Sequence, residues 1–260
     1  SSTKTVKSFD LKGNLLWDIS DQKSSLEEEP ICTPIESRGK LFCLTQRNRD
    51  AINTLGFAVY DACNGSLISK TPISIVSKNL PDSGNRGTRA NWNTFTHDDH
   101  FIAEESFVFG YTGTGVLFKA DANAGTLLWA KGFPRSNTST PTTYFEESGF
   151  SPSGFIKIYD DVLVSFMPDA QMFKALNKKT SDYIWETNFY RPKYIHDREN
   201  SSYLYFSSES AKNEPVIYKI NPLSGETIWQ MPTNGLAISG EGVVINKRLY
   251  IPSDKSILII

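Results

Sequence analysis

The chain has 260 residues, and its 27 Lys and Arg residues nearly balance 29 Asp and Glu residues. This balance argues against nucleic acid or an anionic membrane surface as the main partner. Hydrophobic residues make up 39% of the chain, enough for a buried core, and no apolar run approaches the roughly 18 to 20 residues of a membrane-spanning helix. We therefore expect an ordered chain with no nucleic-acid partner and no transmembrane segment.

The N-terminal part of the chain gives two indications. It opens with Ser1-Ser2-Thr3 and shows no charged-then-apolar leader, which indicates a processed chain or an excised segment. Cys32 and Cys43 lie on neighbouring strand-like runs and could pair in a disulfide, whereas Cys63 leaves an odd thiol. The alternative is that all three cysteines are small buried residues.

The main signal is a repeat. Five segments combine an alternating apolar strand, an Asp or Asn, a short turn and a second apolar strand. They span residues 6–17, 57–68, 116–129, 172–185 and 216–229. In four of them a tryptophan stands four residues after the turn tip, and Ser69 takes this place in the second. These tryptophans are Trp17, Trp129, Trp185 and Trp229.

Each repeat predicts a β-hairpin. The Asp or Asn side chain can accept hydrogen bonds from the turn backbone, and a glycine at the tip can adopt a positive φ. The tips are Gly13, Gly65, Gly125, Ser181 and Gly225. They recur every 44 to 60 residues or so, about the length of one four-stranded propeller blade. Two more strand-like runs precede the hairpin in most copies, for example at residues 31–36 and 40–46, and no segment keeps a helical period. The predicted fold class is therefore all-β.

The motif Asp-x-x-x-Gly-x-Leu-x-Trp, complete from Asp121 to Trp129, resembles the repeat of PQQ-like (quinoprotein alcohol dehydrogenase-like) β-propellers. The resemblance covers nearly the whole chain and implies a single propeller domain, residues 1–260, built of four-stranded antiparallel blades. Residues 242–245, 248–251 and 256–260 read as the first three strands of a last blade. We predict five blades in a ring closed by the N- and C-terminal strands. The alternative is part of a larger ring of six to eight blades.

Long segments between the repeats are the predicted binding loops. Residues 70–99 and 133–154 form the longest two, and long loops on a rigid scaffold concentrate binding residues. Their cationic, amide and aromatic side chains suit a sugar, a carboxylate or a peptide. The alternative is an ordinary polar loop. The candidate ligand-binding residues, including two on a further inter-blade loop, are Arg86, Arg89, Asn91, Trp92, Asn93, Tyr144, Tyr190 and Arg191.

The remaining motifs predict no catalytic or metal-binding residue. His97 and His100 are three positions apart, so they cannot share one face of a strand, and a solvated turn is the better interpretation. The run Thr112-Gly113-Thr114-Gly115 joins two strands rather than opening a helix, which argues against a phosphate loop.

Three Asn-x-Ser/Thr sequons lie in polar, turn-like stretches, at Asn64, Asn137 and Asn200. We expect these asparagines to be glycosylated, which would make the protein secreted, extracellular or lumenal.

The resemblance implies two functions of different classes. Quinone-dependent alcohol dehydrogenases of this type have an adjacent cysteine pair over the cofactor, a calcium ion and a catalytic Asp, and this sequence has no adjacent cysteines. Other proteins with similar repeats are not enzymes, among them a bacterial outer-membrane assembly lipoprotein and the lumenal sensing domains of stress kinases. We therefore predict a non-catalytic propeller, with no cofactor favoured, that binds a sugar, a small molecule, a peptide or a protein partner on its loop-rich face. The alternative is an oxidoreductase with pyrroloquinoline quinone (PQQ) or another group in the central channel.

Overall fold

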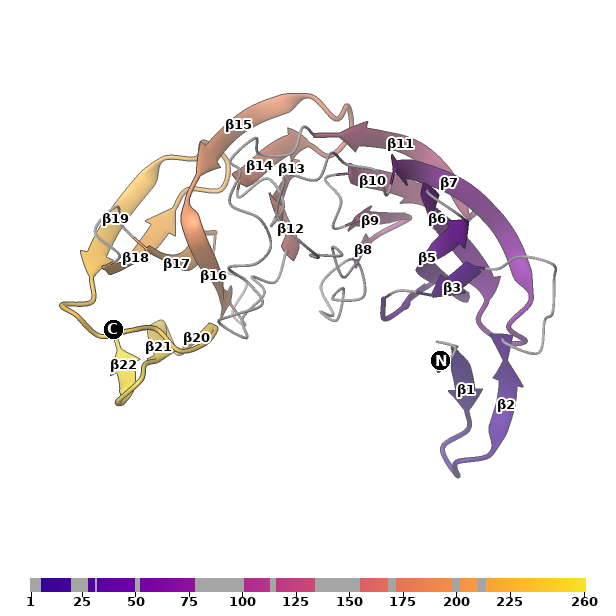
Figure 1. The fold of residues 1–260 in the computed structure, drawn as a ribbon, viewed down its shortest axis with the longest axis horizontal. Coiled ribbons are helices and arrows are strands. Elements are labelled where there is room, and N and C mark those ends of the chain that lie inside the picture. Colours follow the sequence, from indigo (N-terminus) through magenta and orange to yellow (C-terminus); the bar gives the residue numbers. More distant parts are fainter. Residues whose placement is uncertain are drawn as a thin grey trace. The chain divides into compact units, whose positions relative to one another are not determined.

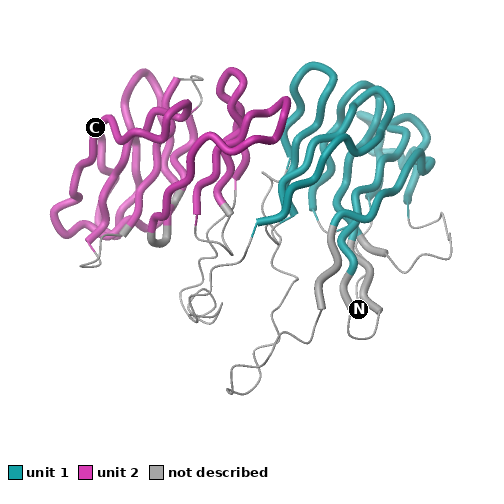
Figure 2. Tube along the Cα trace, turned by 90° about the horizontal axis from the view of Figure 1, so that it is seen from above, with its two compact units in different colours: residues 1–133 teal, residues 134–260 magenta. Residues whose placement is uncertain are grey.

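The computed structural model describes residues 6–19, 28–30, 32–49, 52–77, 101–112, 116–133, 155–167, 172–197, 202–209 and 214–260. Every named element in these ranges is a β-strand, so the all-β prediction is confirmed (Figure 1). A search of the same residues finds no helix with the length and apolarity needed to cross a membrane. The chain divides into two compact units, residues 1–133 and 134–260 (Figure 2). The prediction of a single domain over residues 1–260 stays a prediction.

Unit 1 contains three sheets, and each follows the chain order. The first is the hairpin of β1 (Lys7–Phe9) and β2 (Leu15–Asp18). The second runs from β3 (Glu28–Pro30) and β4 (Ile35–Ser37), which both pair with β5 (Lys40–Arg49), to β6 (Ile52–Asp61) and β7 (Leu67–Ser77). The third orders β8 (Phe101–Glu104), β9 (Phe107–Tyr111), β10 (Val116–Asp121) and β11 (Thr126–Gly132).

Unit 2 begins with a four-stranded sheet and continues with a seven-stranded one. The first orders β12 (Phe155–Tyr159), β13 (Val162–Met167), β14 (Met172–Asn177) and β15 (Tyr183–Asn188). The second contains the meander β16 (Tyr190–Asp197), β17 (Leu204–Glu209), β18 (Pro215–Ile220) and β19 (Thr227–Pro232). It also contains the meander β20 (Gly242–Ile245), β21 (Arg248–Pro252) and β22 (Ile257–Ile259). A short parallel pairing of β16 with β20 joins these two meanders.

We call each antiparallel meander a blade and name it by its strands. The four-strand order predicted from the repeats is present in the β3–β7, β8–β11, β12–β15 and β16–β19 blades, with the first strand of the β3–β7 blade in two pieces. In the sheets of the described residues, β1 pairs with β2 and β22 pairs with β21, and no ladder links these two hairpins. Closure of a five-bladed ring by the two ends therefore stays a prediction.

Two sequence-based assignments need correction. Of the predicted strand at residues 31–36, only Ile35 and Glu36 belong to a strand, β4, and residues 32–34 lie in the interruption between β3, which ends at Pro30, and β4. Pro34 lies in this interruption and has no N–H to donate to a ladder. Tyr190 and Arg191, predicted on an inter-blade loop, are instead the first two residues of β16.

The hydrophobic core lies between successive blades. In unit 1, Phe57 of β6 packs on Phe118 of β10 with ring centroids 5.3 Å apart. In unit 2, Phe173 of β14 packs on Phe206 of β17 at 4.7 Å. Third strands such as β10 and β14 are buried along most of their length, whereas the fourth strands alternate between covered and exposed positions. The sequence predicts alternating burial in these strands, whereas four successive residues of each are buried, including Lys119 and Lys174 at 6% and 4% exposed.

Candidate functional site

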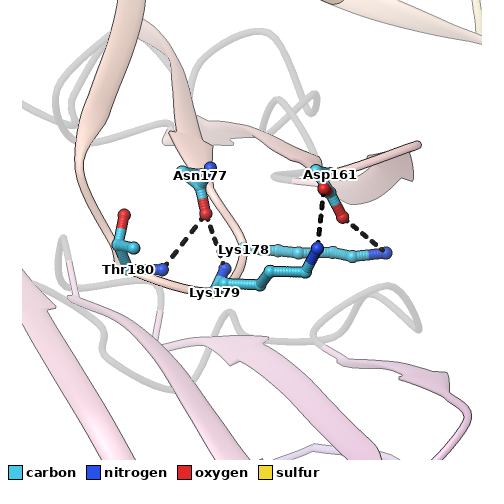
Figure 3. Close-up of polar contacts among 5 residues, drawn as sticks. All are labelled: Asp161, Asn177, Lys178, Lys179 and Thr180. Carbon is cyan, nitrogen blue, oxygen red and sulfur yellow. Dashed lines mark hydrogen bonds and ion pairs between the residues drawn. The ribbon is translucent and has the colours of Figure 1, made fainter.

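The Asp or Asn of each repeat holds its own turn, as the sequence predicts. After β14, the Asn177 Oδ1 accepts hydrogen bonds from the backbone N–H groups of Lys179 (2.9 Å) and Thr180 (3.1 Å) (Figure 3). Asp161 lies beside this turn, 2.8 Å from the Lys179 Nζ and 3.9 Å from the Lys178 Nζ. The hydrogen bond from Lys179 is the main reason that the pKa of Asp161 is lowered. In the other repeats, backbone N–H groups of the turn donate hydrogen bonds in the same way to the side chains of Asp10, Asp61, Asp121 and Asn221.

The turn tips have the left-handed backbone that the repeat predicts. The φ values are +86° at Gly13, +73° at Gly65, +70° at Gly125, +64° at Ser181 and +76° at Gly225. Only glycine adopts this region without steric strain, so the glycine of four repeats is explained by its turn.

Tryptophan side chains fasten one blade to the next within each unit. The Trp17 Nε1 donates to the Ala62 carbonyl at 3.2 Å, and the Trp185 Nε1 donates to the Pro222 carbonyl at 2.8 Å. A Cβ added at Gly65 would lie 2.7 Å from the Trp17 ring, and one at Gly225 would lie 2.7 Å from the Trp185 ring. The residues of the motif are therefore engaged in holding the blades.

Side chains with a different arrangement gather on the first strands of unit 2. They come from β12, from β16 and from the residue before β20. We define the first-strand cluster as Lys157, Tyr159, Tyr194, His196, Asp197 and Glu241. Two observations bring these strands together: the Phe155 and Tyr194 rings stack with centroids 4.3 Å apart, and β16 pairs with β20. In a propeller, the first strands surround the central channel.

Aromatic rings form the base of the first-strand cluster. Tyr159 and Tyr194 are 8% and 9% exposed and belong to the core between the β12–β15 and β16–β19 blades. The Tyr159 hydroxyl donates to the Tyr203 carbonyl at 3.3 Å. The Lys157 Nζ lies 5.3 Å from the Tyr159 ring centroid and 6.0 Å from that of Tyr194. A cation at this distance from ring faces is attracted by their negative electrostatic potential.

Charged groups form the open side of the first-strand cluster. The His196 Nε2 lies 2.6 Å from the Glu241 Oε2, and these side chains remain 42% and 40% exposed. The His196 ring also contacts Tyr194 edge-on, with centroids 4.9 Å apart. The His196 and Glu241 side chains are therefore accessible to solvent beside the buried Tyr194 ring.

The electrostatics of the first-strand cluster differ from those of an ordinary surface. Burial lowers the pKa of the Lys157 ammonium, and the negative charge of Asp197 opposes this shift in part. Burial also raises the pKa of Tyr159 well above its ordinary value, with smaller contributions from Tyr194 and Asp197. Titratable groups perturbed by both burial and a charged neighbour are typical of functional sites.

The sequence-predicted binding residues are placed only in part. Tyr190 and Arg191 begin β16, the strand that also contributes Tyr194, His196 and Asp197 to the first-strand cluster. The other predicted contacts lie outside the described residues: Arg86, Arg89, Asn91, Trp92, Asn93 and Tyr144. His97, His100 and the sequons at Asn137 and Asn200 lie outside them as well.

Asn64 and the three cysteines do lie in the described part of the chain. Asn64 is exposed in the turn between β6 and β7. Cys32, Cys43 and Cys63 are free thiols. Within the described ranges, no group of three or more His, Cys, Asp or Glu side chains is arranged to hold a metal ion.

Sequence reasoning did not identify the first-strand cluster. Its members come from two strands and from the residue before a third, and only the alternation Lys157-x-Tyr159 and Tyr194-x-His196 places polar groups beside aromatic ones on one strand face. Such alternation is also what a half-buried structural strand shows. The signal was therefore present but could not be separated from ordinary blade packing.

Comparisons with solved structures identify the fold. The crystal structure of BamB from Moraxella catarrhalis aligns with a TM-score of 0.58 and 14% identity, covering all of this chain and 67% of that one. A europium-containing methanol dehydrogenase aligns with a TM-score of 0.52 and 9% identity, over 95% of this chain and 62% of that one. Comparison of the sequence with protein-family models and with curated proteins finds no match. At these identities the likeness concerns the fold alone, and that fold is the PQQ-like β-propeller.

Proposed function

We propose that this chain is a non-catalytic β-propeller that binds a polar peptide or protein segment, with the first-strand cluster as part of the binding site. One observation carries the proposal. A half-buried lysine ammonium, Lys157, lies over two tyrosine rings next to an accessible His196–Glu241 pair. The ring contacts and the His196–Glu241 pair already orient these side chains, so a ligand loses less free energy in ordering them.

A peptide matches the mixed chemistry of this cluster. Lysine and a histidine N–H donate hydrogen bonds, as a peptide carbonyl or carboxylate requires. The carboxylates of Asp197 and Glu241 accept hydrogen bonds, as peptide N–H groups or basic side chains require.

The cluster does not fit the quinone cofactor that the fold suggests. A tricyclic quinone binds between flat apolar or aromatic surfaces, and the two tyrosine rings here are more than nine-tenths buried in the inter-blade core. Neither of these two tyrosine rings offers an open face for stacking. An oxidoreductase is therefore the alternative function, and we derive no reaction from it.

An immobilised library of synthetic peptides tests the proposal. The purified chain should bind a defined subset of peptides. The double variant Lys157→Met/Glu241→Gln should lose about 10-fold or more in signal on that subset, because each replacement keeps the side-chain volume and removes a charge. Lys255→Met is the control, because it removes a charge from an exposed position of the β21–β22 turn that is not a member of the cluster.

Two results would contradict this function. One is a library in which no peptide is bound above the level of an unrelated propeller. The other is alcohol-dependent dye reduction after the chain has been incubated with PQQ and calcium, with the absorbance of a retained quinone between 300 and 600 nm.

A secreted or lumenal location is also part of the proposal, and the exposed position of the Asn64 sequon in a turn supports it. The intact mass of the protein from its native source tests this location. Additions of glycan-sized mass to the 29.1 kDa chain are expected, and an unmodified mass would contradict the location.

A further inference from the structure

The interrupted first strand of the β3–β7 blade places a cysteine in an unusual role. Both β3 and β4 pair with β5, through Pro30 opposite Thr45 and Ile35 opposite Phe42. Cys32 lies between these two pairings, where the ladder is broken. The backbone N–H of Leu44 donates to the Cys32 Sγ at 3.4 Å. The sulfur thus takes the place of the carbonyl that a continuous strand would supply.

Cys43, the preceding residue of β5, meets Cys32 at this break. Cys43 is fully buried, in a small core with Ala58 and Tyr60. Its Sγ lies 3.3 Å from the Leu44 carbonyl oxygen. The sulfurs of Cys43 and Cys32 therefore both contact the backbone of one residue, Leu44.

The two thiols have different environments. Hydrogen bonds from Cys43 and from the Leu44 N–H stabilise a thiolate on Cys32 and lower its pKa, although burial acts in the opposite direction. The hydrogen bond to Cys32 and burial raise the pKa of Cys43 well above its ordinary value. Cys32 is also the more accessible of the two, since it is only partly buried. This asymmetry is what a pair with one attacking and one resolving thiol requires.

We propose that Cys32 and Cys43 form an oxidisable pair that closes to an intrachain disulfide by exchange with a small disulfide such as glutathione disulfide. The Cys32 thiolate attacks one sulfur of glutathione disulfide, so that the glutathione S–S bond breaks and one glutathione thiolate leaves. Cys43, after losing its proton to solvent or to that thiolate, attacks the Cys32 sulfur and releases the second glutathione. The pair loses two electrons and two protons, and two molecules of reduced glutathione carry them.

The bond would tie the interrupted edge of the β3–β7 blade to its second strand. Because β3 and β4 are three residues each, the covalent link would add to a ladder that has few hydrogen bonds of its own. The inference rests on unit 1 and is independent of the proposed binding function.

Thiol counting on the Cys63→Ser variant tests the pair. Cys63 is exposed in the β6–β7 turn, and its removal leaves only the two thiols of interest. After incubation with glutathione disulfide and denaturation in a thiol reagent, we expect the loss of both thiols. We also expect a mass lower by two hydrogen atoms and a proteolytic fragment that joins the peptides of Cys32 and Cys43.

Single-thiol variants separate the two roles. In the Cys63→Ser background, Cys43→Ser should accumulate a stable glutathione adduct on Cys32, whereas Cys32→Ser should leave Cys43 unmodified in the folded protein. The proposal is overturned if both thiols survive oxidation in the Cys63→Ser variant. It is equally overturned if that variant ends as a glutathione adduct or as a dimer linked between chains.

Discussion

One side-chain oxygen organises the turn of each of the five repeats. The Asp121 Oδ1 accepts hydrogen bonds from the backbone N–H groups of Asn123 (2.7 Å) and Ala124 (3.0 Å). The Asn177 Oδ1 does the same in its own repeat. Aspartate and asparagine therefore give the same geometry, but only aspartate titrates. This difference makes the acid stability of the molecule depend on which residue occupies the position.

Exchange of these residues should change the pH dependence of stability. The hydrogen bonds from Ala124 and Asn123 lower the pKa of Asp121 in the folded state. The resulting stabilisation is present above the unfolded-state pKa and is lost as the pH falls through the folded-state pKa. Asp121→Asn should therefore lose less in Tm than the wild type between neutral pH and about pH 3, and Asn177→Asp should lose more. An Asp121→Asn variant with the acid sensitivity of the wild type would contradict this account.

Glycine at a turn that packs against a tryptophan ring should be harder to replace than glycine at a turn with no neighbouring side chain. Gly225→Ala would strain a φ of +76° and place a Cβ 2.7 Å from the Trp185 ring, whereas Gly235→Ala would strain a φ of +85° with no atom within 4 Å. We expect losses in the free energy of unfolding of about 3 kcal/mol and about 1 kcal/mol, respectively, from backbone strain and a displaced Trp hydrogen bond. Equal losses in the free energy of unfolding, measured by denaturant titration, would contradict a stabilising contact between Gly225 and Trp185.

At the scale of elements, the repeats made the hairpins predictable. Alternating strands, an Asx acceptor and a glycine tip all act within about a dozen residues, so the sequence displays them directly. The break between β3 and β4 was missed because it depends on Pro34 within an otherwise strand-like run. The extension of β16 to Tyr190 was missed because its pairing with Glu209 is set by β17 and not by local residues.

The tryptophans of the fourth strands should contribute unequally. Trp185→Phe removes the hydrogen bond to the Pro222 carbonyl, and we expect a loss of about 1 to 2 kcal/mol beyond that of the smaller ring. Among the described residues, the Trp129 Nε1 is buried without a hydrogen-bond partner, so Trp129→Phe should lose only the packing contribution. Thermal unfolding of both variants measures the difference. A Trp129→Phe variant as unstable as Trp185→Phe would show that its N–H is bonded.

At the scale of the whole molecule, fold and site differ in how far the sequence predicts them. The propeller follows from repetition, since the same hairpin recurs five times along the chain. The first-strand cluster draws two residues from β12, three from β16 and one from the approach to β20, and its aromatic base is also core. Such a site depends on how successive blades pack, and no local motif marks Lys157 or Glu241. The fold shared with BamB and methanol dehydrogenase does not identify the first-strand cluster either. One fold can carry many different sites, because the residues that stabilise a fold differ from those that form a site.

The dissociation constant of a library-selected peptide tests the binding site most directly. It would be measured by titration for the wild type, Lys157→Met and Lys219→Met. Lys219 is the matched control, because its Nζ also lies over a tyrosine, 3.7 Å from the Tyr203 ring centroid, but outside the first-strand cluster. We predict affinity weakened about 10-fold or more for Lys157→Met and changed less than about 2-fold for Lys219→Met. Wild-type affinity in Lys157→Met, or equal losses in both variants, would contradict the assignment of this cluster as the binding site.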